Sequence, residues 1–85
     1  MKIKDGFIIS EIADESLLVP TDGSFGGVVR INDTARFIIE CLQEETTKEK
    51  VIEKLQKEYD AKRDELAHSV DITLEVLKKI GALEE

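Results

Sequence analysis

The sequence predicts an α+β fold in which a three-stranded antiparallel sheet is followed by three helices. Up to residue 31, short β-branched and aromatic runs alternate with polar and glycine-rich stretches; from residue 32 onward, apolar residues recur at helical spacing. Short strands that follow one another directly favour an antiparallel meander. The length of 85 residues allows one modest core. We therefore expect a single domain over residues 1–85.

Three short runs predict the strands. Residues 7–12 combine β-branched and aromatic residues, and residues 17–20 form a second apolar run. Pro20 cannot donate to a strand ladder, so we expect it at the end of the second strand. The glycine-rich stretch 21–27 predicts a loop or hairpin connection, and residues 28–31 predict a short third strand.

Helix boundaries are predicted from capping residues. Asn32 suits the N-cap of the first helix, because its side chain can accept a bond from an otherwise unpaired N–H group. The run Thr46-Thr47-Lys48-Glu49 fits a capping box at the start of the second helix. The third helix is expected from about Ala61 to Ile80, with Asp60 as its cap and Gly81 ending it. Leu83 is expected to fold back onto the domain.

The third helix has an unusually wide apolar face. At 100° per residue, its apolar side chains cover an arc of roughly 220°, about twice the width that a surface helix needs. These residues are Leu66, Ala67, Val70, Ile72, Leu74, Val76, Leu77 and Ile80. Such a helix contacts something on two sides. Either it is central, between the sheet and the other helices, or part of the arc lines a groove for a partner.

The predicted sheet offers a second indication of binding. Three strands cannot close a barrel, so two edges are left with unpaired N–H and C=O groups. A peptide can add to such an edge as an extra strand, with main-chain bonds giving affinity and side-chain pockets giving specificity. Many sheets have edges and bind nothing, so this indication is weak alone.

No catalytic or metal-binding pattern is found in the sequence. His68 lies on the polar side of the third helix without a partner residue, and no spacing typical of zinc ligands occurs. Cys41 lies among apolar neighbours and is expected to be a small buried hydrophobe. The glycine-rich stretch lacks the Lys-Ser/Thr of a phosphate-binding loop. We expect a protein that is not an enzyme and binds no metal or cofactor.

Charge and hydropathy narrow the partners and the compartment. The net charge of −7 disfavours nucleic acid, whose binders usually carry a basic surface. No apolar run is long enough to span a bilayer, and the first residues do not resemble a signal peptide. The single cysteine precludes an internal disulfide. We expect a cytoplasmic protein without nucleic-acid or membrane partners.

A family resemblance follows from these elements and covers most of the chain. Ile31-Asn32-Asp33-Thr34-Ala35 resembles the Leu-Asn-x-Thr-Ala signature of the PqqD-like family, named for coenzyme PQQ synthesis protein D. Residues 46–51 are similar to the Thr-x-x-Glu-x-Ile start of its second helix. Four residues match its last helix: Val70, Leu74, Leu77 and Gly81. Ser69 and Thr73 replace an Asp and a Phe that are common there, which bears on specificity.

The resemblance implies a winged-helix-like domain that acts as a RiPP recognition element, a non-catalytic module for ribosomally made, modified peptides. The leader segment of a precursor peptide would add beside the third strand and pack on the third helix. The domain would then present it to a modifying enzyme, often of the radical SAM class, and would itself hold no cofactor. The implied peptide-binding residues are Val28, Val29, Arg30 and Ile31 on the strand, and Leu66, Ala67, Val70, Thr73 and Leu74 on the helix.

Two other functions stay open from the sequence. A winged-helix topology also occurs in DNA-binding domains, although these require a basic recognition face. A structural protein-interaction domain, self-associating through the open sheet edge, is the third possibility. The sequence does not identify the precursor, the modifying enzyme, the product or the oligomeric state.

Overall fold

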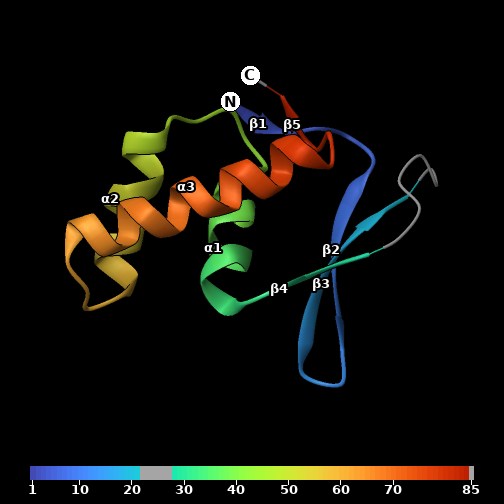
Figure 1. Cartoon of the computed structure of the whole chain (residues 1–85), viewed down its shortest axis with the longest axis horizontal. Coiled ribbons are helices and arrows are strands. Elements are labelled where there is room, and N and C mark those ends of the chain that lie inside the picture. The colour runs from blue at the N-terminus through green and yellow to red at the C-terminus, as the bar shows by residue number, and fades with distance from the viewer. Residues whose placement is uncertain (22–27, 85) are drawn as a thin grey trace.

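The structure is a computed structural model that describes residues 1–21 and 28–84. Its elements are β1 (Lys2–Ile3), β2 (Phe7–Ile12), β3 (Glu15–Pro20), β4 (Val29–Ile31), α1 (Asp33–Cys41), α2 (Lys48–Glu58), α3 (Arg63–Lys79) and β5 (Leu83–Glu84). The predicted α+β class, a three-stranded antiparallel sheet followed by three helices, is confirmed (Figure 1). Most of the connection predicted at 21–27 lies outside the described residues.

The main sheet has the strand order β2-β3-β4, with both pairs antiparallel. Strand β2 has the predicted bounds, whereas β3 begins at Glu15, earlier than expected, and β4 begins at Val29 rather than Val28. In Figure 1 the β2–β3 hairpin extends away from the helices. Arg36 of α1 ties this hairpin to the helices, since its guanidinium pairs with Glu11 and donates to the Ser16 hydroxyl at 3.4 Å.

The β2–β3 hairpin turns in two residues. Ile12 lies opposite Glu15, which leaves Ala13 and Asp14 as the whole loop. Their φ angles are 51° and 67°, so both residues are in the left-handed region, as a type I′ turn requires. This turn matches the twist of the paired strands, but a non-glycine residue in that region costs about 1–2 kcal/mol. Aspartate tolerates the conformation better than alanine, so the strain is concentrated at Ala13.

Two of the three predicted helix caps differ in the structure. Asn32 caps α1 as predicted: its Oδ1 accepts from the Ala35 N–H at 2.7 Å. Helix α2 is capped by Thr47, whose Oγ1 accepts from the Lys50 N–H at 3.3 Å, so the prediction of a box starting at Thr46 was wrong. Thr46 is buried, and its N–H donates to the Met1 carbonyl at 3.0 Å. Because Thr46 is held by the start of the chain, the cap of α2 lies one residue later than predicted.

Helix α3 begins later than the sequence predicted. Its first residue is Arg63, and the flanking Lys62 makes no side-chain cap bond. Asp60 is therefore not the cap, because it lies two residues before the capping position. At the other end the prediction is correct: Gly81 adopts φ 73°, and its N–H donates to the Lys78 carbonyl at 3.1 Å.

The chain ends pair with each other, which the sequence predicted only as a contact by Leu83. Ile3 lies opposite Leu83 in the two-stranded sheet of β1 and β5. The Ile3 N–H donates to the Leu42 carbonyl at the end of α1, and the Lys4 N–H donates to Ala82, both at 2.8 Å. Figure 1 shows this small sheet beside the C-terminal end of α3. The ends of α1 and α3 are thus held together by the terminal strands.

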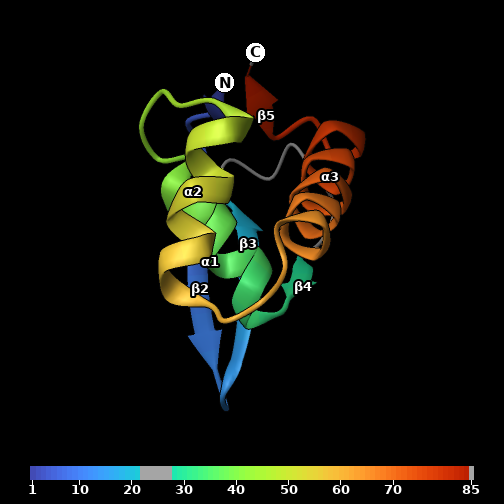
Figure 2. The ribbon, with the colours of Figure 1, turned by 90° about the vertical axis from the view of Figure 1, so that its left-hand side faces the viewer.

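The core lies between the three helices and one face of the main sheet. Eight large side chains are less than 2% exposed: Leu18, Ile38, Ile39, Leu42, Val51, Leu55, Val70 and Leu77. Helix α3 packs on both α1 and α2, and α1 and α2 also pack on each other. Figure 2, viewed from the helical side, shows the strands behind the helices and β4 at the side nearest α3.

We predict that Ala13→Gly raises the free energy of unfolding by roughly 0.5–1 kcal/mol. Glycine removes the left-handed strain, and the gain is partly offset by the greater freedom of glycine in the unfolded chain. Urea denaturation followed by circular dichroism measures the change. The control is Ala67→Gly, the same substitution inside α3, which should lower stability by about 1 kcal/mol. Equal effects of the two variants would contradict the strain at Ala13.

Candidate functional site

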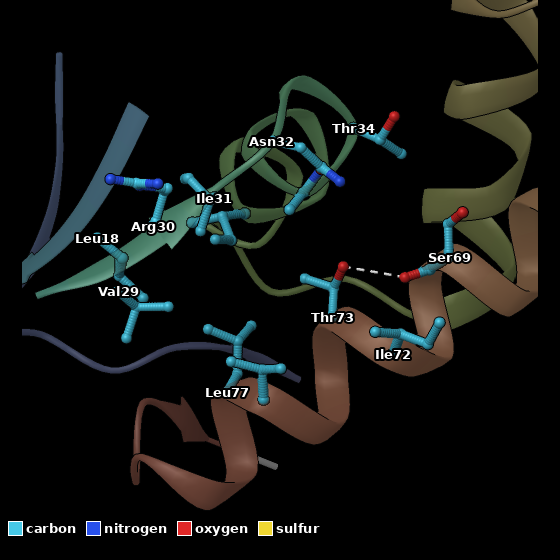
Figure 3. Close-up of a pocket in the computed structure, with 13 residues that line it drawn as sticks. Leu18, Val29, Arg30, Ile31, Asn32, Thr34, Ser69, Ile72, Thr73 and Leu77 are labelled. Atoms are coloured by element: carbon cyan, nitrogen blue, oxygen red, sulfur yellow. Dashed lines mark hydrogen bonds between the residues drawn. The ribbon is translucent and has the colours of Figure 1, made fainter. Parts of the chain in front are cut away.

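A groove of about 280 Å³ lies between β4, the start of α1, and α3. Its lining comprises Leu18, Val29, Arg30, Ile31, Asn32, Thr34, Ala35, Ile39, Ser69, Ile72, Thr73, Val76 and Leu77. Figure 3 shows the residues of β4 facing those of α3 across the groove. One wall is therefore the edge of a sheet, and the other is a helix.

Within the described part of the chain, β4 pairs only with β3, so its other edge is open beside the groove. The direction of its main-chain groups follows from the alternation of bonded and non-bonded pairs along antiparallel strands. The Thr21 N–H donates to the Gly6 carbonyl at 2.6 Å, which fixes that pair as hydrogen-bonded. The next pair, Phe7 with Pro20, is then non-bonded, as suits a proline without an N–H.

The same alternation determines which residue of β4 faces the open edge. Two pairs beyond Phe7 and Pro20, the pair of Ile9 and Leu18 is again non-bonded, so the main-chain groups of Leu18 point away from β2. They point toward β4, where Val29 is the partner of Leu18. Arg30, opposite Leu17, is therefore at a non-bonded position. Its N–H and C=O point away from β3. The open edge thus offers one donor and one acceptor of Arg30 to the groove.

The side chains of β4 alternate between the two faces of the sheet. Val29 and Ile31 share the face of the buried Leu18 and line the groove. The Arg30 side chain lies on the opposite face, where it is 76% exposed and its Nε is 3.4 Å from a carboxylate oxygen of Glu15. Figure 3 shows it directed away from α3. Arg30 contributes its main chain to the groove and its charge to the far side.

The helix wall is apolar although two of its residues carry hydroxyls. The Thr73 hydroxyl donates to the Ser69 carbonyl at 2.9 Å, and the Ser69 hydroxyl donates to the Glu65 carbonyl at 3.2 Å (Figure 3 draws the first bond). Both hydroxyls are used within the helix. Ile72 and Val76, one turn apart, remain 52% and 37% exposed at the rim. Exposed branched side chains along a concave surface are typical of a binding site.

Four of the nine predicted peptide-binding residues line the groove: Val29, Arg30, Ile31 and Thr73. Val28 precedes β4, is 55% exposed and is not part of the lining. Ala67 is half-buried, whereas Leu66, Val70 and Leu74 are buried in the core. Whether any of the nine contacts a peptide stays a prediction.

On α3, the sequence reasoning did not select four residues of the lining: Ser69, Ile72, Val76 and Leu77. The signal that could have found them was the wide apolar arc itself. Val70 and Leu74 point into the helical layer, so the opposite edge of the arc, with Ile72 and Val76, faces the sheet. Periodicity gave the width of the arc but not its direction.

Other groups with chemical potential lie outside the groove. Cys41 is half-buried at the end of α1, and burial raises the pKa of its thiol above the usual value, although Lys54 opposes this rise. A raised pKa makes the thiol a poor nucleophile at neutral pH. Residues 1–21 and 28–84 contain no cluster of metal-binding side chains. Nor does this part contain a helix that is long and apolar enough to cross a bilayer.

The fold and the groove define a small α+β domain in which an open sheet edge faces an apolar helix wall. The family model for coenzyme PQQ synthesis protein D (PqqD) matches residues 11–83. The chain belongs to the PqqD family, which confirms the resemblance seen in the sequence. A comparison with curated proteins gave no match.

Two solved structures share this fold. The chain described as TbiB1 in complex with the TbiA(beta) leader peptide is 24% identical, with a TM-score of 0.78 over 99% of this chain and 95% of that chain. The chain described as lasso peptide synthetase B1 complexed with the leader peptide is 19% identical, with a TM-score of 0.76 over 99% and 96%. The winged-helix likeness is tested by neither comparison and stays a prediction.

We predict different outcomes for aspartate substitutions at Val70 and Ile72, which are two residues apart and lie on opposite sides of α3. Val70→Asp should destabilise the fold by several kcal/mol, because Val70 is fully buried and an unpaired carboxylate would lose its hydration. Ile72→Asp should change stability by no more than about 0.5 kcal/mol, because its side chain is half exposed. Thermal melts of both variants measure the difference. Unfolding of Ile72→Asp would place this residue in the core rather than at the groove.

Proposed function

We propose that this protein binds the leader segment of a ribosomally made precursor peptide and presents it to a separate modifying enzyme. The observation that carries the proposal is the open β4 edge, with the Arg30 main-chain groups directed toward an apolar wall of α3. Support comes from the PqqD family membership and from the two solved structures of the same fold, both described as complexes with a leader peptide.

The geometry suggests how a leader would bind. An extended segment adds beside β4 and exchanges two main-chain hydrogen bonds with Arg30. Its side chains then alternate, so every second one enters the groove between Ile31 and the pair Ile72 and Val76. Each net hydrogen bond contributes about 0.5–1.5 kcal/mol, so most of the affinity comes from apolar burial.

The groove supplies binding groups rather than catalytic ones. Among the described residues that line the groove, Arg30 is the only one with an ionisable side chain. The Ser69 and Thr73 hydroxyls donate to helix carbonyls, and residues 1–21 and 28–84 place no general base in the lining that could activate them. In this proposal, the chemistry of modification and any cofactor belong to a separate enzyme. That this enzyme is of the radical SAM class is an expectation from the family resemblance.

Arg30→Pro tests the strand addition directly. Proline removes the one N–H that points at the guest, and it is tolerated on an edge strand when its nitrogen faces away from the ladder. The titrants for calorimetry are synthetic peptides that correspond to the N-terminal segments of the short reading frames flanking the gene. We expect at least ~10-fold weaker binding, from the lost bond and the steric bulk of the ring at the edge.

Arg30→Ala is the matched control, because it removes the charged side chain and keeps the main-chain N–H. Its affinity should stay within about threefold of that of the original protein, since the side chain lies on the far face. Circular dichroism checks that both variants are folded. If Arg30→Pro binds the leader as tightly as Arg30→Ala, the leader does not add to β4.

A further inference from the structure

The groove between β4 and α3 differs in depth along its length. Residues four apart on a helix lie one above the other on the same side, so Ser69, Thr73 and Leu77 form one row along the groove. Figure 3 shows this row beside β4, with Leu77 toward Val29 at one end and Ser69 at the other. The row begins with two short side chains and ends with a leucine. The groove is therefore deeper beside Ser69 and Thr73 than beside Leu77.

Large side chains surround this deeper part on its other sides. Ile72 and Val76 form the exposed rim on α3, and Ile31 projects from β4. Ile39 of α1 also lines the groove and is only 1% exposed, so it closes the groove toward the core. The volume of about 280 Å³ lies just below the roughly 300–1,000 Å³ of small-molecule pockets. A hollow of this size suits one or two amino acid side chains.

Thr73 presents a methyl group, rather than a hydroxyl group, to the deeper part. Its hydroxyl donates to the Ser69 carbonyl at 2.9 Å, and Figure 3 shows the methyl group on the side that faces β4. The Ser69 hydroxyl is likewise used, by the Glu65 carbonyl. A charged guest side chain would lose its hydration here without gaining an ion pair, because the Arg30 guanidinium lies on the other face of the sheet. The deeper part therefore accepts an apolar side chain.

We propose that Thr73 sets the size of the leader side chain that this protein accepts. The inference rests on the proposed function, in which a leader strand pairs with Arg30. The two leader residues that flank the paired one then direct their side chains into the groove. The one opposite Ile31 enters the deeper part, over Thr73, and is a large apolar residue of the size of leucine or phenylalanine. A residue larger than threonine at position 73 would occupy the same space.

Thr73→Phe tests the room in the groove without any peptide. The new ring should lie in the groove rather than in the core, so the melting temperature should stay within about 3 °C of the original value or rise. Val70→Phe is the matched control on the same helix, because Val70 is fully buried. Overpacking the core should lower the melting temperature by at least ~4 °C. An equal loss for the two variants would mean that position 73 has no room, and would overturn the proposal.

Calorimetric titration then tests the selection of the leader side chain. The titrants are synthetic N-terminal segments of the short reading frames flanking the gene, each also made with single alanine substitutions. Thr73→Phe should weaken leader binding by at least ~10-fold, because the ring takes the space of the guest side chain. Thr73→Val is the matched control, which keeps the shape of the side chain and removes the hydroxyl. Its binding should stay within about threefold of the original, since the hydroxyl is used within the helix.

The alanine-substituted leaders test whether one leader position meets Thr73. Alanine at the large residue should weaken binding to the original protein by at least ~10-fold, but should change binding to Thr73→Phe by less than about threefold. Alanine elsewhere in the leader should affect both proteins equally. If a leader binds but is insensitive to Thr73→Phe, couples to it at no single position, or is weakened as much by Thr73→Val, the inference alone is overturned. If the original protein binds none of these peptides, the proposed function is overturned with it.

Discussion

The burial of Val70 and Leu77 is the interaction on which the rest of this structure depends. These residues fix α3 against α1 and α2 along one face of the helix. The helix is thereby held beside β4 without closing over it, and Ile72 and Val76 remain uncovered. If α3 packed directly on β4, the sheet edge would be sealed and the groove would be filled. The stability of the core and the openness of the site follow from the same packing.

Much of the fold could be predicted because its signals are local. The bounds of β2 and the Asn32 cap depend on residues next to each other in the chain. The start of α2 could not be predicted, because Thr46 is tied to Met1, far away in the sequence. Strands β1 and β5 are two residues each, too short for any periodic pattern, and form only because the chain ends meet.

The site was predicted in part, for a physical reason. Strand β4 is only three residues long and is followed directly by the Asn32 cap of α1. Its position in the sequence therefore leaves few other residues than Val29, Arg30 and Ile31 to form this wall of the groove. On α3 the apolar arc is so wide that its centre and its edge are equally plausible as the groove side. Which edge of the arc is buried depends on where α1 and α2 lie around α3, and the periodicity of α3 alone does not give these positions. Leu66 and Leu74 therefore lie in the core, and Ile72 lies at the rim.

The pairing of β1 with β5 has a consequence for the energetics of the groove. One end of the groove is set by the junction of β4 and α1 at Asn32, and the other end of α3 is clamped to α1 through Ile3 and Leu83. A groove whose two ends are held in place is preorganised, so a bound peptide does not have to bring its walls together. In the proposed complex the entropy lost on ordering then falls almost entirely on the peptide. A leader that is cyclised or otherwise restrained in an extended conformation would therefore bind more tightly, because less of its own conformational entropy is lost on binding.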